Sequence, residues 1–231
     1  MTLTREGARF SSSSNPGNWM KSAASVSISD SAGEAASAIG IFSLIPDFIK
    51  TISVKDTGCF SGSAIEHDGK LFLMYTGVTN EGNGYEQVQC IAYSEDGIHF
   101  EYKNSYQEPT IGNMWECPDV FKINNQFFMI FSPENTDQPP KPNSNARYMP
   151  IDFDEDTLTI KDHGDWPYLD HGLDFYAPQT FLSKDNERLL LGWLRMRKPV
   201  QGEEWIGMFI MPRILHEKDG KIIQELYPKI K

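Results

Sequence analysis

Three segments of this chain share one layout, and their spacing is the feature that most restricts the fold. Each opens with small or polar residues, continues as a short strand-like run, passes through a tight turn signal and returns as an apolar run. The segments are FSGSAIEHDGKLFLMYTG from Phe60, ECPDVFKINNQFFMIFSP from Glu116 and FYAPQTFLSKDNERLLLGWL from Phe175, with starts 56 and 59 residues apart. Such a period suits one four-stranded propeller blade per segment, because fixed-period similarity is typical of radial repeats. We therefore predict an all-β fold with at least three propeller blades.

A propeller also predicts which residues meet. The innermost strand of each blade lines the central channel, so the residues that open the three repeats would converge on one axis. These residues are Phe60, Ser61, Glu116, Asp119, Tyr176 and Gln179. A sandwich of short hairpins is the alternative, and it would scatter them.

The chain divides into two parts by composition. Residues 1–44 are an atypical segment in which Ser and Ala make up 18 positions and no strand or helix period persists, so we expect it to be poorly ordered. From Ile45 onward, short runs of β-branched and aromatic residues alternate with turn signals such as Asp68-Gly69 and Asp219-Gly220. We expect residues 45–231 to form a partial propeller domain.

Charge and targeting features exclude several classes of partner. The formal charge of -11 argues against nucleic acid or an anionic membrane, since both require a basic face. No apolar stretch approaches the roughly 18 residues of a membrane span, and the first 50 residues show no signal-peptide pattern. The three cysteines lack a paired C-x-x-C spacing, which indicates reduced thiols. We expect a soluble cytoplasmic protein that forms no nucleic-acid or membrane complex.

Glu116 is the best candidate for acid-base chemistry. It lies between Trp115 and Cys117 at the start of a repeat, where apolar neighbours would suit a carboxyl group that donates a proton. A glycosidase needs two such carboxyl groups, about 5 to 5.5 Å apart when the reaction retains configuration. The alternative for Glu116 is an exposed loop glutamate without a catalytic role.

Several strings resemble glycoside hydrolase family 32, the β-fructosidases, which include invertase and sucrose-6-phosphate hydrolase. GCFSGSA, MWECPDVF and LDFYAPQTF resemble three hallmark strings of that family, in the family's order. LLLGWL and MPRIL resemble its final blade, so the resemblance covers roughly residues 45–231. It implies a five-bladed β-propeller, here incomplete, with about three recognisable blades and with the first blade and part of a later one missing or altered.

The resemblance also implies roles for individual residues. Glu116 corresponds to the general acid/base, whereas Phe60 and Ser61 correspond to contacts for the fructosyl unit. Asp119 closes the ECPD motif and would orient Glu116 or the sugar hydroxyls. Three aromatic residues are further candidates for substrate binding, namely Trp115, Tyr176 and Trp193, although blade packing is an equal alternative for the last two.

Two departures from the family pattern bear on activity. The family's nucleophile is an Asp in a W-M-N-D-P-N-G string, and nothing in residues 1–44 reproduces that string. Its R-D-P motif, whose Asp stabilises the transition state, should precede ECPD by some tens of residues, but here Glu108-Pro109 is followed almost directly by MWECPD. We therefore expect a truncated or internally deleted relative whose hydrolytic activity is impaired or lost.

The resemblance implies a small carbohydrate partner, sucrose, sucrose 6-phosphate or a fructan, and no cofactor or metal. The Asp-His pairs at His163 and His171 could suggest metal ligands, but their spacing fits ordinary turns better. A non-catalytic carbohydrate-binding pseudoenzyme and a gene remnant are the alternatives to an enzyme. Missing strands would leave blade edges open, so we also expect self-association.

Overall fold

The computed structural model describes residues 58–79, 86–107, 111–112, 114–134, 145–196 and 198–229. Within these ranges the chain forms thirteen strands and no helix. The predicted disorder of residues 1–44 lies outside the described residues. The all-β prediction is confirmed.

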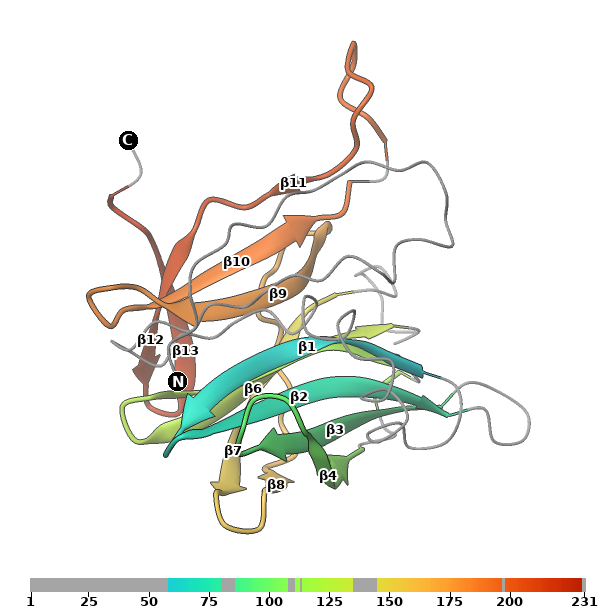
Figure 1. Ribbon diagram of the computed structural model, residues 1–231. Helices are drawn as coiled ribbons and strands as arrows, with labels where there is room; N and C mark the ends of the chain where they lie inside the picture. The colour runs from blue at the N-terminus through green and yellow to red at the C-terminus, as the bar shows by residue number, and fades with distance from the viewer. Residues whose placement is uncertain are drawn as a thin grey trace.

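The strands form three antiparallel sheets (Figure 1). The first contains β1 (Gly58–His67), β2 (Lys70–Thr79), β3 (Glu86–Ser94) and β4 (Glu101–Tyr106) in sequential order. The second contains β5 (Met114–Ile123), β6 (Gln126–Glu134), β7 (Arg147–Asp154) and β8 (Thr159–Asp162), also sequential. In the third, β9 (Phe175–Leu182), β10 (Arg188–Leu194), β12 (Arg213–Lys218) and β13 (Lys221–Leu226) are neighbours, and the short β11 (Met208–Phe209) also pairs with β10. Each predicted repeat thus supplies the first two strands of one sheet.

Turn chemistry explains the hairpins that the sequence predicted. Asp68 and Gly69 both have positive φ, 49° and 74°, and they connect His67 to Lys70, which pair directly. Asp219 and Gly220 adopt the same left-handed conformation, 52° and 73°. Two successive positive φ angles match the right-handed twist of the flanking strands, which is why Asp-Gly favours two-residue hairpins.

The core consists of three apolar clusters, two of which join neighbouring sheets. One lies within the first sheet, around Leu73 and Tyr75. A second joins the first and second sheets, where Met74 and Ile91 pack with Trp115 and neighbouring side chains. The third joins the second and third sheets and contains Phe121, Phe128, Phe175, Leu190 and Leu215. Successive sheets therefore pack against each other as the blades of a propeller do.

Buried hydrogen bonds add to the contact between the first two sheets. The backbone carbonyl of Trp115 accepts hydrogen bonds from Thr76 Oγ1 and Gln89 Nε2, both at 2.9 Å. Thr76 and Gln89 are fully or almost fully buried, at 0% and 1% exposure. Because these groups would be costly to bury unpaired, the bonds fix how the first sheet is placed on β5.

Candidate functional site

The first strand of every sheet carries a β-bulge at the corresponding place. In each bulge, two successive paired positions are three residues apart on the first strand but two apart on the partner strand. The first strand therefore contains one additional residue at the bulge. The bulges lie between Cys59 and Gly62 in β1, between Glu116 and Asp119 in β5, and between Tyr176 and Gln179 in β9. A bulge bends its strand and redirects the adjacent side chains. Glu116 and Tyr176 thus occupy equivalent positions in neighbouring sheets.

Local conformation supports this equivalence. Cys117 and Ala177, which follow Glu116 and Tyr176, have left-handed φ angles of 53° and 49°. Each is followed by a proline, which cannot donate a ladder hydrogen bond and is tolerated in a strand at a bulge. Left-handed conformations in non-glycine residues cost energy and tend to occur at functional sites.

The bulges bring Glu116 and Tyr176 into contact. The Tyr176 hydroxyl donates a hydrogen bond to Glu116 Oε2 at 2.6 Å. Tyr176 is 4% exposed, whereas Glu116 is partly exposed. Burial, reinforced by the adjacent Glu116, raises the pKa of the Tyr176 phenol far above its usual range. The phenol therefore stays protonated and acts as a donor.

The bulge of β1 joins the same region. Ser61 Oγ lies 3.3 Å from Cys117 Sγ, and Gln179 Nε2 donates to the Cys117 carbonyl at 3.5 Å. Burial raises the pKa of the Cys117 thiol, which keeps it in its unreactive form. Phe60, at the start of β1, is 49% exposed. Residues from all three first strands thus lie around Glu116.

Asp119 is oriented away from solvent. It is 2% exposed, and its Oδ2 accepts hydrogen bonds from the backbone N–H and the hydroxyl of Thr180, both at 2.7 Å. Arg188 Nη1 contacts the same Thr180 hydroxyl at 3.5 Å. Burial raises the pKa of Asp119 and lowers that of Arg188, while each charge opposes the shift of the other. This network links β5 to β9 and β10.

The two tryptophans predicted to bind substrate, Trp115 and Trp193, lie in different environments. Trp115 is 4% exposed, stacks on Phe131 with ring centroids 4.0 Å apart, and donates from Nε1 to the Ile111 carbonyl at 2.6 Å. Its side chain lies in the core between the first two sheets. Trp193 is 40% exposed and is paired with Tyr176 across β9 and β10, which places it beside the candidate site.

Two charged residues of this site, Glu134 and Arg195, were not predicted from the sequence. Arg195 stacks over the Tyr176 ring, with its guanidinium carbon 4.5 Å from the centroid, and its Nη1 donates to Glu134 Oε1 at 2.9 Å. Glu134 and Arg195 each stand at the end of an apolar strand run, and this position is the sequence signal that could have indicated them. Their pairing spans 61 residues, so only the packing of two sheets brings them together.

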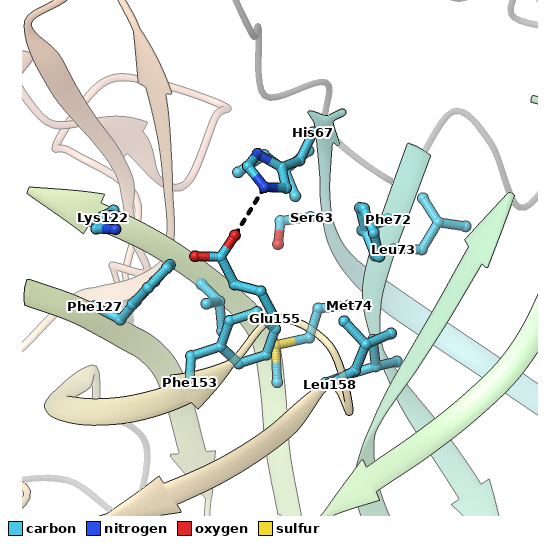
Figure 2. Close-up of a pocket in the computed structure, with 13 residues that line it drawn as sticks. Ser63, His67, Phe72, Leu73, Met74, Lys122, Phe127, Phe153, Glu155 and Leu158 are labelled. Carbon is cyan, nitrogen blue, oxygen red and sulfur yellow. Dashed lines mark ion pairs between the residues drawn. The ribbon is translucent and has the colours of Figure 1, made fainter. Parts of the chain in front are cut away.

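A separate cavity of about 180 Å³ lies between the first and second sheets (Figure 2). Its walls are mostly apolar and include Phe72, Met74, Ile91, Phe127, Phe153 and Leu158. His67, the last residue of β1, pairs with Glu155 at 2.8 Å beside it. Since Phe60 lies near the opposite end of β1, this cavity is distinct from the Glu116 region.

The described residues were also compared with the requirements of a metal site and of a membrane-spanning helix. None of their His, Cys, Asp and Glu side chains form a group of three or more that could hold a metal ion. The same part of the chain contains no helix long and apolar enough to cross a membrane.

Comparisons with known proteins identify the family. The model of the glycosyl hydrolases family 32 N-terminal domain matches residues 45–111 and, as a second segment, residues 94–226. A sucrose-6-phosphate hydrolase from Escherichia coli is 30% identical over 234 residues, covering 72% of this chain and 49% of the relative. A raffinose invertase from Escherichia coli is 28% identical, with the same coverage. The chain spans about half the length of these relatives.

Solved structures show the same fold. The sucrose-6-phosphate hydrolase from Lactobacillus gasseri superposes with a TM-score of 0.58 at 20% identity, covering 78% of this chain and 51% of that one. A family 32 β-fructofuranosidase from Bombyx mori superposes with a TM-score of 0.55 at 23% identity, covering 76% and 52%. The propeller prediction is confirmed, and coverage of half of each neighbour agrees with an incomplete propeller. The chain belongs to glycoside hydrolase family 32.

Proposed function

We propose that this chain carries the acid/base half of a β-fructofuranosidase site and binds terminal β-D-fructofuranosides such as sucrose or sucrose 6-phosphate. The observation that carries the proposal is the contact between Glu116 and Tyr176 at two equivalent bulges. In a retaining glycosidase a carboxylic acid protonates the leaving oxygen while a second carboxylate attacks the sugar. Glu116 is the group that would donate this proton.

The surrounding residues suit a sugar ligand. Phe60 and Trp193 are half-exposed aromatic side chains, and rings of this kind pack against the apolar faces of sugars. Ser61 adds a hydroxyl beside Cys117. We assign Phe60, Ser61 and Trp193 to substrate contact, Tyr176 to support of Glu116, and Asp119 and Trp115 to the structure beneath the site.

We further propose that the chain alone hydrolyses fructosides poorly or not at all. Two carboxylates near Glu116 are already engaged: Asp119 is buried against Thr180, and Glu134 pairs with Arg195. Neither is placed to attack a sugar. Removal of a nucleophile eliminates most of the rate enhancement, because residues that act as a unit are strongly non-additive.

The pattern of matches supports an internal deletion. The family model matches in two overlapping segments rather than one. The alignment with the Escherichia coli sucrose-6-phosphate hydrolase runs over 234 residues but takes in only 72% of this 231-residue chain, so part of the relative's aligned stretch has no counterpart here. These two findings favour missing strands between Tyr106 and Met114, where the R-D-P motif is absent.

The test is to measure fructose release from sucrose and fructose binding by calorimetry, with Glu116→Gln as the matched control. We expect measurable binding by both proteins and no release above the control, because the acid lacks its partner nucleophile. Release that is lost in Glu116→Gln would mean that another carboxylate serves as nucleophile and that the deletion argument is wrong. Absence of both release and binding would leave a gene remnant.

We also propose that the chain self-associates through exposed blade edges. In the third sheet, apolar side chains in β11 and in the loops that flank it are exposed by 44% to 76%, namely Trp205, Ile206, Phe209 and Met211. Sedimentation at micromolar concentration should show dimers or larger species, and Phe209→Ser with Met211→Ser should shift them towards monomer. A monomeric parent protein with a sharp thermal transition would contradict this. The cytoplasmic location expected from the sequence remains part of the proposal.

A further inference from the structure

The phenol ring of Tyr176 is held from two sides by groups on different strands. Its hydroxyl donates to Glu116 Oε2 at 2.6 Å, on β5 of the neighbouring sheet. The Arg195 guanidinium lies over its face, 4.5 Å from the ring centroid. Arg195 is in turn paired with Glu134, at the end of β6, at 2.9 Å. Together these contacts form a continuous series from Glu134 through Arg195 and Tyr176 to Glu116.

A backbone hydrogen bond also holds this series of contacts in place. Arg195 directly follows β10, and its backbone N–H donates to the Asp174 carbonyl at 2.6 Å, just before β9 begins. The end of β10 is therefore tied to the start of the strand that carries Tyr176. A cation stacked on an aromatic face is attractive, and the attraction increases as the ring is removed from water. The buried ring has little freedom to turn away from Glu116.

From this geometry we propose that Tyr176, clamped by Arg195 and Glu134, is a positioning residue that fixes Glu116 so that Oε1 carries and delivers the acidic proton. The inference rests on the proposed acid role of Glu116. An oxygen that accepts a short hydrogen bond from a phenol acts as the carbonyl oxygen of a protonated carboxyl group, so the proton is placed on the other oxygen. When Glu116 gives up this proton, the same phenol donates to the resulting carboxylate.

The phenol itself does not lose a proton in this scheme. Burial first, and then the adjacent Glu116, raise the pKa of Tyr176, with further contributions from Glu134 and Cys117. Arg195 is the one cation that the described contacts place against the ring, and it acts in the opposite direction. Hence the pKa of the phenol at position 176 depends on the charges that surround it.

The experiment incorporates 2,3,5,6-tetrafluorotyrosine at position 176, whose phenol is several pH units more acidic than that of tyrosine and so offsets the raised pKa, and follows its ionisation by fluorine NMR. Glu116→Gln should lower the ionisation midpoint, because it removes an adjacent negative charge, by about one pH unit or a tenfold change in acidity. Arg195→Met should raise the midpoint, and Arg195→Lys should return it towards the parent value. Packing alone would not produce shifts of opposite sign.

A second variant tests the positioning role independently of the fluorinated residue. Tyr176→Phe removes only the hydroxyl, so it should change fructose affinity less than about threefold, while Phe60→Ala should weaken it about tenfold by removing a sugar contact. Equal losses in the two variants would mean that Tyr176 contacts the sugar directly and would overturn the inference. A midpoint unaffected by Glu116→Gln would overturn it too.

These outcomes are separable from failure of the proposed function. If the parent protein shows no fructose binding by calorimetry, the proposed function fails, yet the fluorine titration still measures the contact between Tyr176 and Glu116. If the parent protein binds fructose and the titration shows no coupling, the positioning inference alone is wrong.

Discussion

Asp119→Ala should lower the free energy of unfolding by about 3 kcal/mol, measured by urea denaturation. The substitution removes the acceptor for the backbone N–H and hydroxyl of Thr180, and both lie in the interior. It also removes the carboxyl group that offsets the buried charge of Arg188. Because the network joins β5 to β9 and β10, the loss should appear as global destabilisation rather than local fraying.

Asp119→Asn is the matched control, since its amide oxygen can still accept both hydrogen bonds from Thr180. We expect it to cost about half as much as Ala, because it keeps the acceptor for Thr180 but loses the charge that faces Arg188. The two variants should also differ from the parent protein in pH dependence. Burial raises the pKa of Asp119 in the folded state, so the parent loses stability as pH rises from the unfolded value, about 3.9, through the raised one. Neither variant should show this decline, and equal costs for Ala and Asn would contradict the hydrogen-bond explanation.

Gly62→Ala should cost about 3 kcal/mol of stability, because a side chain at this position cannot be accommodated. A Cβ there would lie 1.8 Å from the Met74 carbonyl oxygen and 2.6 Å from the Tyr75 Cα, both backbone atoms of β2. Relief requires β1 and β2 to separate at the bulge. Thermal and urea unfolding would measure the loss, and fructose affinity should fall with it because Phe60 and Ser61 belong to the same bulge.

Gly69→Ala is the control for this prediction in the same hairpin. Gly69 has a φ of 74°, but a Cβ there meets nothing within 4 Å. Only the left-handed conformation is penalised, at about 1 kcal/mol. A cost at Gly69 as large as that at Gly62 would indicate that backbone conformation, rather than the clash with β2, dominates in both cases.

Much of the fold could be predicted because the repeats carry local signals. Alternating apolar runs and Asp-Gly turns specify each hairpin, and the repeated spacing predicts equivalent sheets. The repeats also predicted that the residues that open them would meet, and the structure brings Glu116 and Tyr176 together, although the repeat starts aligned Glu116 with Phe175 rather than with Tyr176. Local patterns were sufficient wherever one strand and its own turn decided the outcome.

Contacts between sheets were beyond local patterns. The pairing of Arg195 with Glu134 depends on how two sheets pack, and neither residue has an unusual neighbourhood in the sequence. Trp115 is a second example, in which the sequence suggested a site residue that the structure places in the core. It adjoins Glu116, which suggested a place in the sugar site, but side chains alternate along a strand, and its ring packs on Phe131 in the core.

The cavity between the first and second sheets leaves part of the join between them accessible to water. His67 and Glu155, which line it, have side chains that are 53% and 42% exposed, and about 180 Å³ beside Phe72 and Phe127 is not filled by side chains. Hydrogen bonds to Trp115 hold another part of the same join. Local opening is easiest where buried apolar contacts are few. Hydrogen exchange should therefore show opening along this join before it shows opening of the packed contact between the second and third sheets, and such opening would separate the sheet that carries Phe60 and Ser61 from the one that carries Glu116.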